Sequence, residues 1–517
     1  MKPYPLSVHT FSDLIQGGFL YVDKTAWIHR IVSIPKGAFF LSRPRRFGKS
    51  LLLSTFKAIF LGERSLFEGL AIDKLPYDWK PYPVIHLDLG AKQADSADRL
   101  EELLCYGLDD CSRLYGVNLE RRGAGARFDE LIQAIARRVG KVVVLIDEYD
   151  KPILGNIQNT EAVKEIRDLL KGFYSVLKSA DPHLRFVFLT GVSKFSKVSV
   201  FSDLNNLRDL SMDPAYTDLL GYTEEELGRH FGEAIRALSA KEGWTYEKTL
   251  EKIRAWYNGY RFSREPTTVY NPVSVMSLLE THEFRNYWFE TGTPAFLINL
   301  IQTTDYDLRR VEHLRADELA FSAYDVERLS VEPLLFQTGY VTIRDYDSRR
   351  NLYTLGYPNG EVRNAFLAYL ADAYTPVRKE EAAGQIARLE DAVDAGDVDT
   401  FMKELRVFFA GIPYDLQLKN EKYYQTIFYL VFALLGIRVH AEERTSAGRT
   451  DAVVETAKRV FVFEFKLHGT AEEALAQIRD KKYHEKYLGS GKEVTLVGAA
   501  FDEKTRNIGE WVAAEGK

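Results

Sequence analysis

The chain has 517 residues, a length that corresponds to about three domains. Hydrophobic residues make up 46% and charged residues 27%, a globular composition that excludes a disordered chain, a collagen-like chain and a coiled-coil rod. The 68 Lys and Arg residues and the 74 Asp and Glu residues give a net charge of −6, which excludes a simple polycationic nucleic-acid binder. Any contact with nucleic acid must therefore use a local patch.

The sequence shows no sign of export or membrane insertion. The first residues carry a charge but no apolar segment, so we expect no secretion signal. The longest apolar run, residues 427–435, is about half of the roughly 20 residues that a membrane span needs, and we interpret it as a buried helix. The two cysteines, Cys105 and Cys111, are expected to be reduced. We expect a cytoplasmic protein with no membrane contact.

Residues 1–215 alternate short apolar runs with helical patterns. The strand-like runs are unbroken and rich in β-branched or aromatic residues, and they lie at 38–41, 84–89, 142–146 and 186–189. Runs of this kind are typical of strands buried on both faces, which means a parallel sheet covered by helices. This range is predicted to be an α/β domain.

The rest of the chain divides into two further predicted regions. In 216–395, Thr223 and Glu226 form a capping-box pattern at the start of a mostly helical stretch, and runs at 341–343 and 352–355 predict a hairpin. A helical lid with a winged-helix-like module would fit. From 396 to 517 the order reads helix, helix, strand, strand, helix, strand, which predicts a small α/β domain.

The first chemical motif follows the run at 38–41. A strand, a loop that ends in Gly48, Lys49 and Ser50, and then a helix is the context of a P-loop, or Walker A motif. Backbone N–H groups at the helix N-terminus would hold phosphates, Lys49 would neutralise the β- and γ-phosphates, and the Ser50 hydroxyl would ligate Mg²⁺. The first glycine of the usual pattern is Arg43 here, and Gly-Lys-Ser alone also occurs by chance.

A second motif supports the first. The run at 142–146 ends in Asp147 and Glu148, a Walker B pattern. Adjacent carboxylates at the end of a buried strand need a cationic partner, which a bound Mg²⁺ supplies. Asp147 would hold the metal, and Glu148 would orient or deprotonate the attacking water. Solvent-facing acids would explain Asp-Glu alone, but the pairing with Gly-Lys-Ser favours a nucleotide site.

Three further features of this region stay open. Thr190 and Ser193 follow the run at 186–189 and could sense the γ-phosphate, although turn formation at Gly191 explains them equally well. Arg208 is a candidate arginine finger, in cis or toward a neighbouring subunit, or else an ordinary surface residue. The loop arginines could bind nucleotide phosphates or a nucleic-acid backbone, or pair with acids of another domain. The predicted nucleotide-binding residues are Arg45, Arg46, Phe47, Gly48, Lys49, Ser50, Asp147 and Thr190.

A second chemical site is predicted near the C-terminus. Residues 459–467 alternate like a strand, so that Glu464 and Lys466 share one face and phenylalanines line the other. Asp451, on the preceding strand of an expected hairpin, can join them. Converging carboxylates favour Mg²⁺, and the lysine can help to deprotonate a metal-bound water, which is chemistry for phosphodiester hydrolysis. Asp followed by Glu-x-Lys is the PD-(D/E)XK nuclease pattern.

Several residues could complete this second site. Gln477 and Tyr483, on the helix that follows, are candidate substrate contacts, and Glu421 is a candidate metal ligand from an upstream helix. The alternative is a strand with a surface salt bridge, which contributes only about 0–1 kcal/mol. The strand context and Asp451 favour the nuclease interpretation.

Taken together, the motifs resemble those of bacterial AAA-ATPase-like proteins that carry a C-terminal PD-(D/E)XK nuclease domain. The resemblance covers essentially the full chain and rests on Asp451, Glu464 and Lys466 and on segments 21–25, 43–50, 145–150, 190–196 and 256–260. It implies ATP binding and a nuclease fold resembling restriction endonucleases. Arg43 looks typical of the family, and Asp23 to Thr25 are expected near the nucleotide base.

Two functional hypotheses follow. The first is an ATPase coupled to a Mg²⁺-dependent nuclease that cuts DNA or RNA, with a role in defence against foreign nucleic acid that rests on analogy alone. The second is a nucleotide-switched regulator that binds nucleic acid or protein through a non-cleaving nuclease fold. A helicase or motor lacks support, while a homo-oligomer that works in trans stays open. The expected cofactors are ATP and Mg²⁺.

Overall fold

The protein folds into two compact units. The computed structural model describes residues 2–90, 94–194, 204, 206–291, 295–304, 306–322, 330–374, 379–410, 429–431, 438–445, 448–466, 468–502, 504–505 and 507–516. The first unit comprises Met1–Leu300 and Glu312–Val362, and the second comprises Ile301–Val311 and Arg363–Lys517. The first unit therefore holds the whole of 1–215 together with much of 216–395, and the division into three ranges stays a prediction.

A parallel sheet forms the centre of the first unit, which confirms the predicted α/β class. Its described strands lie in the order β2-β3-β4-β1-β5, and every neighbouring pair is parallel. The bounds are β1 Gly37–Ser42, β2 Val84–Asp88, β3 Val142–Asp147, β4 Leu184–Gly191 and β5 Leu207–Asp209. Strands β3 and β4 are buried along their whole length, as their unbroken apolar runs predict.

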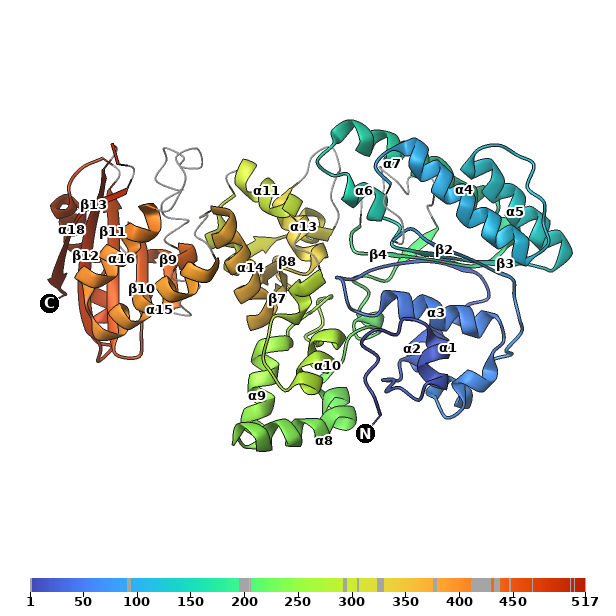
Figure 1. Ribbon diagram of the computed structural model, residues 1–517, viewed down its shortest axis with the longest axis horizontal. Coiled ribbons are helices and arrows are strands. Elements are labelled where there is room, and N and C mark those ends of the chain that lie inside the picture. Colours follow the sequence, from blue (N-terminus) through green and yellow to red (C-terminus); the bar gives the residue numbers. More distant parts are fainter. Residues whose placement is uncertain are drawn as a thin grey trace. The chain divides into compact units, whose positions relative to one another are not determined.

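Helices cover both faces of this sheet. Helices α1, α2 and α3 lie on one face, and α4, α5 and α7 lie on the other (Figure 1). The bounds are α1 Phe11–Gln16, α2 Thr25–Val32, α3 Lys49–Phe60, α4 Ala97–Leu114, α5 Ala124–Arg138, α6 Lys151–Gly155 and α7 Thr160–Ser179. Because the strands of this sheet are parallel, their carboxyl ends lie at one edge. In such sheets the loops at this edge carry the functional side chains.

The remainder of the first unit is a helical region with a small antiparallel sheet. The predicted capping box is confirmed, since the Thr223 side chain accepts from Glu226 N and the Glu226 side chain accepts from Thr223 N. The predicted hairpin is also present, with a further strand in the order β6-β8-β7. The bounds are α8 Glu224–Glu242, α9 Tyr246–Tyr257, α10 Pro272–Thr281, α11 Ala295–Thr303, β6 Leu314–Ala316, α12 Glu318–Ser322, α13 Val331–Thr338, β7 Thr342–Asp347 and β8 Leu352–Gly356.

The second unit contains a mixed sheet in the order β13-β12-β11-β10-β9. Strands β11 and β12 are parallel, and the other neighbouring pairs are antiparallel. The sequence analysis did not predict strands β9 and β13; β9 carries no apolar run, and β13 carries only the short one at 511–514. The bounds are α14 Gly360–Tyr374, α15 Lys379–Ala395, α16 Val398–Ala410, β9 Arg438–Thr445, β10 Gly448–Glu455, β11 Arg459–Lys466, α18 Ala471–Asp480, β12 Glu493–Asp502 and β13 Asn507–Glu515.

Strand β11 has two distinct faces, as its alternating pattern predicts. Phe463 packs against Phe401 of α16, with 6.0 Å between ring centroids, and against Phe461 and Phe465 on its own strand. Val460 and Val462 face the other way and share a core with Ile478 of α18. A Cβ at Gly498 of β12 would collide with the backbone of α18, so this glycine lets the helix lie close to the sheet.

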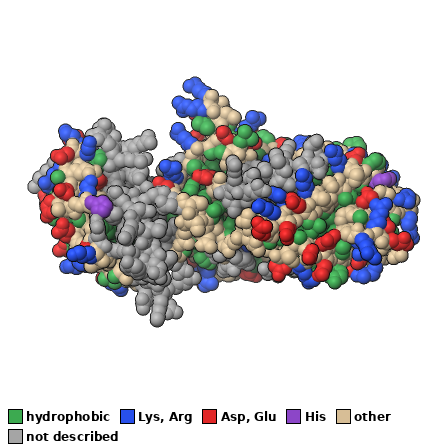
Figure 2. Space-filling view, turned by 90° about the horizontal axis from the view of Figure 1, so that it is seen from above, with side chains coloured by type: hydrophobic (Ala, Val, Ile, Leu, Met, Phe, Trp, Pro, Cys, Tyr) green, Lys and Arg blue, Asp and Glu red, His purple; other side chains and the backbone are tan. Residues whose placement is uncertain are grey.

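Among the described residues, no helix combines the length and the apolar character that crossing a membrane requires. Of the apolar run at 427–435, only 429–431 are described, and they are helical. Over the described part of the face in Figure 2, basic and acidic side chains are interspersed, in line with the small net charge.

Candidate functional site

The phosphate-binding loop lies at the carboxyl edge of the parallel sheet, between the end of β1 at Ser42 and the start of α3 at Lys49. Gly48 has a φ of 88° and Arg46 has a φ of 65°, both in the left-handed region. The left-handed conformation of these two residues lets the chain pass from the strand directly into the helix. The first backbone N–H groups of the helix have no partner within it. The local geometry is therefore that of an anion-binding loop.

Lys49 is held over this loop. Its Nζ donates to the backbone oxygens of Arg43 at 3.0 Å and Pro44 at 3.1 Å, and the residue is 6% exposed. Burial lowers the pKa of Lys49, and the nearby carboxylates of Asp147 and Glu148 oppose that shift. The two carboxylates favour the charged form of the ammonium group, which can exchange its neutral acceptors for anionic ones.

The predicted Walker B residues lie beside it at the end of β3. Asp147 is 4% exposed, and burial raises its pKa, while a hydrogen bond from the Ser50 hydroxyl and the charge of Lys49 lower it. The two groups that were predicted to share Mg²⁺, Ser50 and Asp147, therefore meet in this structure. Both are hard oxygen donors, the type of ligand that Mg²⁺ prefers.

Glu148 occupies a strained position at the same edge. Its φ is 47°, in the left-handed region, and its carboxylate fills the space where a Cβ at Gly90 would lie. Asp88, at the end of β2, pairs in register with Asp147 and raises the pKa of that carboxyl. Sequence reasoning missed Asp88, although it ends β2 just as Asp147 ends β3.

A pocket of about 630 Å³ opens next to these side chains. This volume lies within the range of small-molecule and cofactor sites. Its walls come from the phosphate-binding loop, the N-terminal segment and the helical region, and they include Pro5, His9, Tyr21, Lys24, Arg45, Arg46, Phe47, Gly48, Lys49, Ser50, Glu148, Tyr222 and Met276. The lining is cationic at the loop and largely apolar elsewhere, which suits a nucleotide with its phosphates at the loop and its base among apolar residues.

The segment that was expected near the nucleotide base lies only partly in this pocket. Lys24 lines it, and its Nζ donates to Glu226 Oε1 at 2.7 Å. Asp23 accepts from the backbone N–H of Ala71 at 2.7 Å, and the Thr25 hydroxyl accepts from Ile72 N at 3.0 Å. Asp23 and Thr25 therefore anchor the chain before α2.

The two hydroxyls that were considered as γ-phosphate sensors are engaged elsewhere. Thr190 is fully buried, and its Oγ1 donates to the Leu41 carbonyl at 2.8 Å, so the hydroxyl faces the β1 backbone. The Ser193 N–H and hydroxyl both donate to Asp150, whose carboxylate is 1% exposed. We therefore assign Thr190 a structural role. Sequence reasoning gave Asp150 no role, since its partners Val192 and Ser193 lie in the segment that follows another strand, β4.

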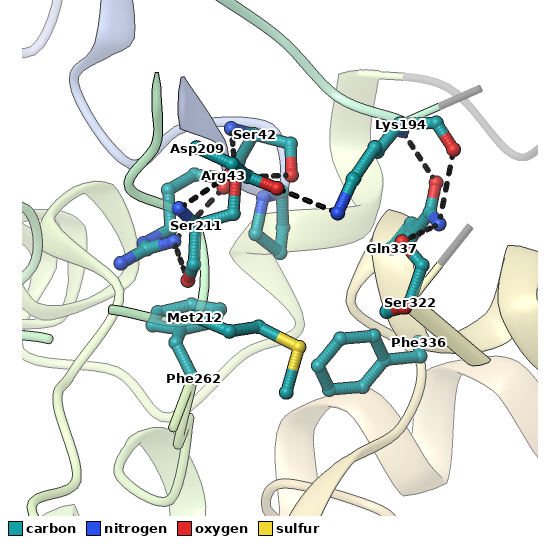
Figure 3. Close-up of a pocket in the computed structure, with 11 residues that line it drawn as sticks. Ser42, Arg43, Lys194, Asp209, Ser211, Met212, Phe262, Ser322, Phe336 and Gln337 are labelled. Atoms are coloured by element: carbon teal, nitrogen blue, oxygen red, sulfur yellow. Dashed lines mark hydrogen bonds and ion pairs between the residues drawn. The ribbon is translucent and has the colours of Figure 1, made fainter. Parts of the chain in front are cut away.

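Arg43 is a buried anchor and is not among the residues that line the pocket of about 630 Å³; it lines a separate, smaller pocket (Figure 3). Its Nη1 donates to the carbonyls of Ser42 at 2.9 Å and Ser211 at 2.7 Å, and its Nη2 donates to Tyr216 O at 3.2 Å. The guanidinium lies 4.1 Å from the centroid of the Phe262 ring. Burial lowers the pKa of Arg43 to about 9. The guanidinium group donates to carbonyls inside the protein. It is therefore not available for the contacts considered from sequence, which were nucleotide phosphates, a nucleic-acid backbone or acids of another domain.

The other arginines differ from it. Arg45 is exposed and lines the pocket, so it is available for phosphate. Arg46 donates to the Tyr287 carbonyl. Arg208 pairs with Asp213 at 2.9 Å and lies over the Tyr216 ring, so we do not propose it as an arginine finger in cis. A role of Arg208 toward a neighbouring subunit stays a prediction.

Replacing Arg43 by alanine is expected to lower the free energy of unfolding of the first unit by about 3 kcal/mol, because three buried carbonyls lose their donor and a cavity forms. Urea unfolding followed by tryptophan fluorescence measures the change. Arg121→Ala, which breaks an exposed pair with Asp129, serves as the control and should cost at most about 1 kcal/mol. Equal costs for the two variants would show that Arg43 is no anchor.

In the second unit, β11 and α18 bring the predicted nuclease residues together. The Lys466 Nζ donates to Gln477 Oε1, and the Gln477 Nε2 donates to Glu464 Oε1. Glu464 is 4% exposed and Lys466 is half-buried. The Gln477 amide thus joins the acid and the lysine, whose shared face was predicted from the alternation along the strand.

The structure places the remaining predicted nuclease residues in different surroundings. Ala452 of β10 pairs with Phe463, so the same antiparallel register brings Asp451 to the position opposite Glu464. Tyr483 lies beyond the end of α18 and not on the helix as predicted; it is 3% exposed and belongs to the core between the sheet and α18, so we do not propose it as a substrate contact. Glu421, like Phe195 and Ser196 of the first unit, lies outside the described residues. Among the described side chains, no group of at least three His, Cys, Asp or Glu residues is arranged to hold a metal ion.

Comparisons with known proteins match an N-terminal and a C-terminal part of the chain to two separate families. A family model described as a predicted AAA-ATPase matches residues 5–201, and a model of the PD-(D/E)XK nuclease superfamily matches residues 419–511. Over 520 residues the chain is 40% identical to the "Uncharacterized protein in vnfD 5'region" of Azotobacter chroococcum mcd 1, with 98% of both chains covered.

Two solved structures are distantly similar. The Aeropyrum pernix ORC1 protein in complex with DNA is 14% identical, with 67% of this chain and 92% of that chain covered and a TM-score of 0.26. Cdc6p from Pyrobaculum aerophilum is 9% identical, with 70% and 93% covered and a TM-score of 0.23. Similarity at this level carries no argument about function. The two family models and the full-length relative do: the chain belongs to the AAA-ATPase-like proteins that carry a C-terminal domain of the PD-(D/E)XK nuclease superfamily.

Proposed function

We propose that this protein binds and hydrolyses ATP with Mg²⁺ and that its C-terminal domain hydrolyses phosphodiester bonds of DNA or RNA with the same cation. The observation that carries the proposal is the convergence of Lys49, Ser50, Asp147 and Glu148 at one edge of the sheet, beside a pocket of about 630 Å³. Lysine, hydroxyl and two acids in this arrangement match the needs of phosphoryl transfer to water.

Each residue of the ATP site has a role in the proposal. Lys49 leaves the carbonyls of Arg43 and Pro44 and donates to phosphate oxygens, which are stronger acceptors because they are charged. Ser50 and Asp147 hold the cation, which neutralises phosphate charge when it is bound. Glu148 orients the attacking water and accepts its proton.

The nuclease half rests on Glu464, Lys466 and the register position of Asp451. The two carboxylates would hold Mg²⁺, which polarises the scissile phosphate when it is bound. Lys466 lies on the same face as Glu464 and stabilises the negative charge that develops on the phosphate. Its ammonium also favours the deprotonated form of a nearby water.

One observation favours the second candidate function, a nucleotide-switched regulator with a non-cleaving nuclease fold. The Gln477 amide engages both Glu464 and Lys466, so a metal or a phosphate would have to share these two groups with that amide. A protein that only grips nucleic acid would tolerate this arrangement.

Calorimetric titration with ATP, together with a cleavage assay, tests the proposal. We expect ATP to bind with Mg²⁺ present, and at least one substrate among single- and double-stranded DNA and RNA to be cut until EDTA is added. ATP binding without cleavage of any substrate, with or without ATP, would favour the regulator. Absence of both would overturn the proposal.

A further inference from the structure

The C-terminal end of helix α13 contacts the loop that leaves β4 beside the nucleotide site. Gln337 is 5% exposed, and its Oε1 accepts from the backbone N–H of Lys194 at 2.6 Å. Its Nε2 donates to the carbonyls of Lys194 at 3.4 Å and Ser322 at 2.9 Å (Figure 3). One side-chain amide thus pairs with both backbone groups of a single residue, in the manner of a neighbouring strand.

Lys194 is bound at the same time to the segment that supports the phosphate-binding loop. Its Nζ pairs with Asp209 Oδ2 at 2.6 Å, and Asp209 Oδ1 accepts from Ser211 N at 2.8 Å. The Ser211 hydroxyl accepts from Ser42 N at 2.9 Å, at the end of β1 (Figure 3). A continuous series of polar contacts therefore joins Gln337 to the residue where the phosphate-binding loop begins.

The same helix end also contacts this loop directly. Gly339 caps α13 with a φ of 90°, and a Cβ there would lie 2.7 Å from the Pro44 ring. A side chain at this position would push the helix away from the loop. Pro44 supplies one of the two carbonyls that accept from Lys49. Helix α13 therefore lies against the part of the loop that would lose its hydrogen bond from Lys49 when phosphate binds.

The residue before Lys194 is also bound at the nucleotide edge. Ser193 donates its backbone N–H to Asp150 at 2.7 Å, and Asp150 closely follows the catalytic pair Asp147 and Glu148. Through these bonds, a shift at the end of β3 that depends on the terminal phosphate would reach the 190–194 segment and the peptide that Gln337 holds.

We infer that Gln337 is a positioning residue that couples the phosphate state of the bound nucleotide to α13 and the β7–β8 hairpin, an inference that rests on the proposed ATP site. Strand β7 begins at Thr342, soon after Gly339, so α13 cannot shift without moving the hairpin. The Thr342 hydroxyl is bonded to both backbone groups of Arg261, at 2.7 and 2.9 Å, which extends the motion to the helical region.

Hydrogen exchange of segment 331–347, measured by mass spectrometry, tests this inference. In the wild-type protein we expect the exchange rate of this segment to differ by at least about threefold between a non-hydrolysable ATP analogue and ADP. In Gln337→Leu, which keeps the bulk but loses the paired hydrogen bonds, we expect that difference to disappear while both nucleotides bind within about threefold of their wild-type affinity.

Thr338→Val is the matched control, because the Thr338 hydroxyl donates only to Leu334 within the same helix among the described contacts. It should keep the nucleotide-dependent difference. A purely structural role of Gln337 would raise exchange equally in both nucleotide states and leave the difference intact, which would overturn the inference. So would a wild-type protein that binds both nucleotides but shows no difference. If the wild-type protein binds neither, the proposed ATP site fails, and the inference fails with it.

Discussion

Lys49→Ala is expected to lower the rate of ATP hydrolysis at least about 100-fold, the usual cost of removing a key charge-stabilising donor from a transition state. The ATP affinity should fall about 10- to 100-fold, since a charge-assisted hydrogen bond contributes roughly 1.5–3 kcal/mol. Phosphate release and calorimetric titration measure the two quantities.

The reason lies in how the site holds this lysine. The Lys49 ammonium is buried against the carbonyls of Arg43 and Pro44 and lies near Asp147 and Glu148. Without its charge, phosphates entering the pocket would meet the two acids with less positive charge from the loop to offset them. Repulsion would then oppose both binding and the approach of water.

Lys57→Ala provides the matched control, because Lys57 is an exposed lysine farther along the same helix α3. It should hydrolyse ATP at close to the wild-type rate. Circular dichroism on both variants separates loss of the fold from loss of the charge. If Lys49→Ala hydrolysed ATP as fast as Lys57→Ala, the phosphates would have to bind elsewhere.

How far the sequence could predict this site depends on the distance along the chain between partners. Lys49, Ser50 and Asp147 were found because each ends or follows an apolar run, and the ends of parallel strands converge at one edge. The role of Arg43 stayed open because its partners, Ser211 and Tyr216, are remote in sequence and leave no periodic signal.

The same limit applies to the polar contacts behind the site. Gln337 carries no motif, since a glutamine on a short helix reads as an ordinary polar residue until the fold brings it to Lys194. In the second unit, the alternation along β11 sufficed to predict the shared face of Glu464 and Lys466. It could not predict that the Gln477 amide would link the two side chains, because α18 and β11 are joined by tertiary packing.

Lys466→Ala is expected to lower the rate of nucleic-acid cleavage about 100- to 1,000-fold while leaving the Mg²⁺ concentration for half-maximal activity unchanged. The lysine acts on charge that develops during the reaction and is no oxygen donor for the cation. Single-turnover cleavage of the best substrate over a series of Mg²⁺ concentrations measures both quantities.

Glu464→Gln separates the metal from the lysine. This change keeps the shape of the side chain but removes a carboxylate charge, so the Mg²⁺ requirement should rise at least about tenfold. Lys458→Ala, at an exposed lysine in the bend before β11, should change neither quantity.

The pattern across these variants decides between the two candidate functions. A nuclease predicts loss of rate at Lys466 and a shifted metal requirement at Glu464, because the two residues share a face but do different chemistry. If the cleavage came from a contaminating nuclease, the three variants would cleave the substrate at the same rate. A regulator that only grips nucleic acid would cut nothing as wild type, and both site variants would then change affinity alone. The link through Gln477 makes the contrast sharper, since Lys466→Ala removes the donor to the Gln477 amide oxygen, whereas Glu464→Gln keeps an oxygen that can accept from the Gln477 NH₂ group and loses only the carboxylate charge.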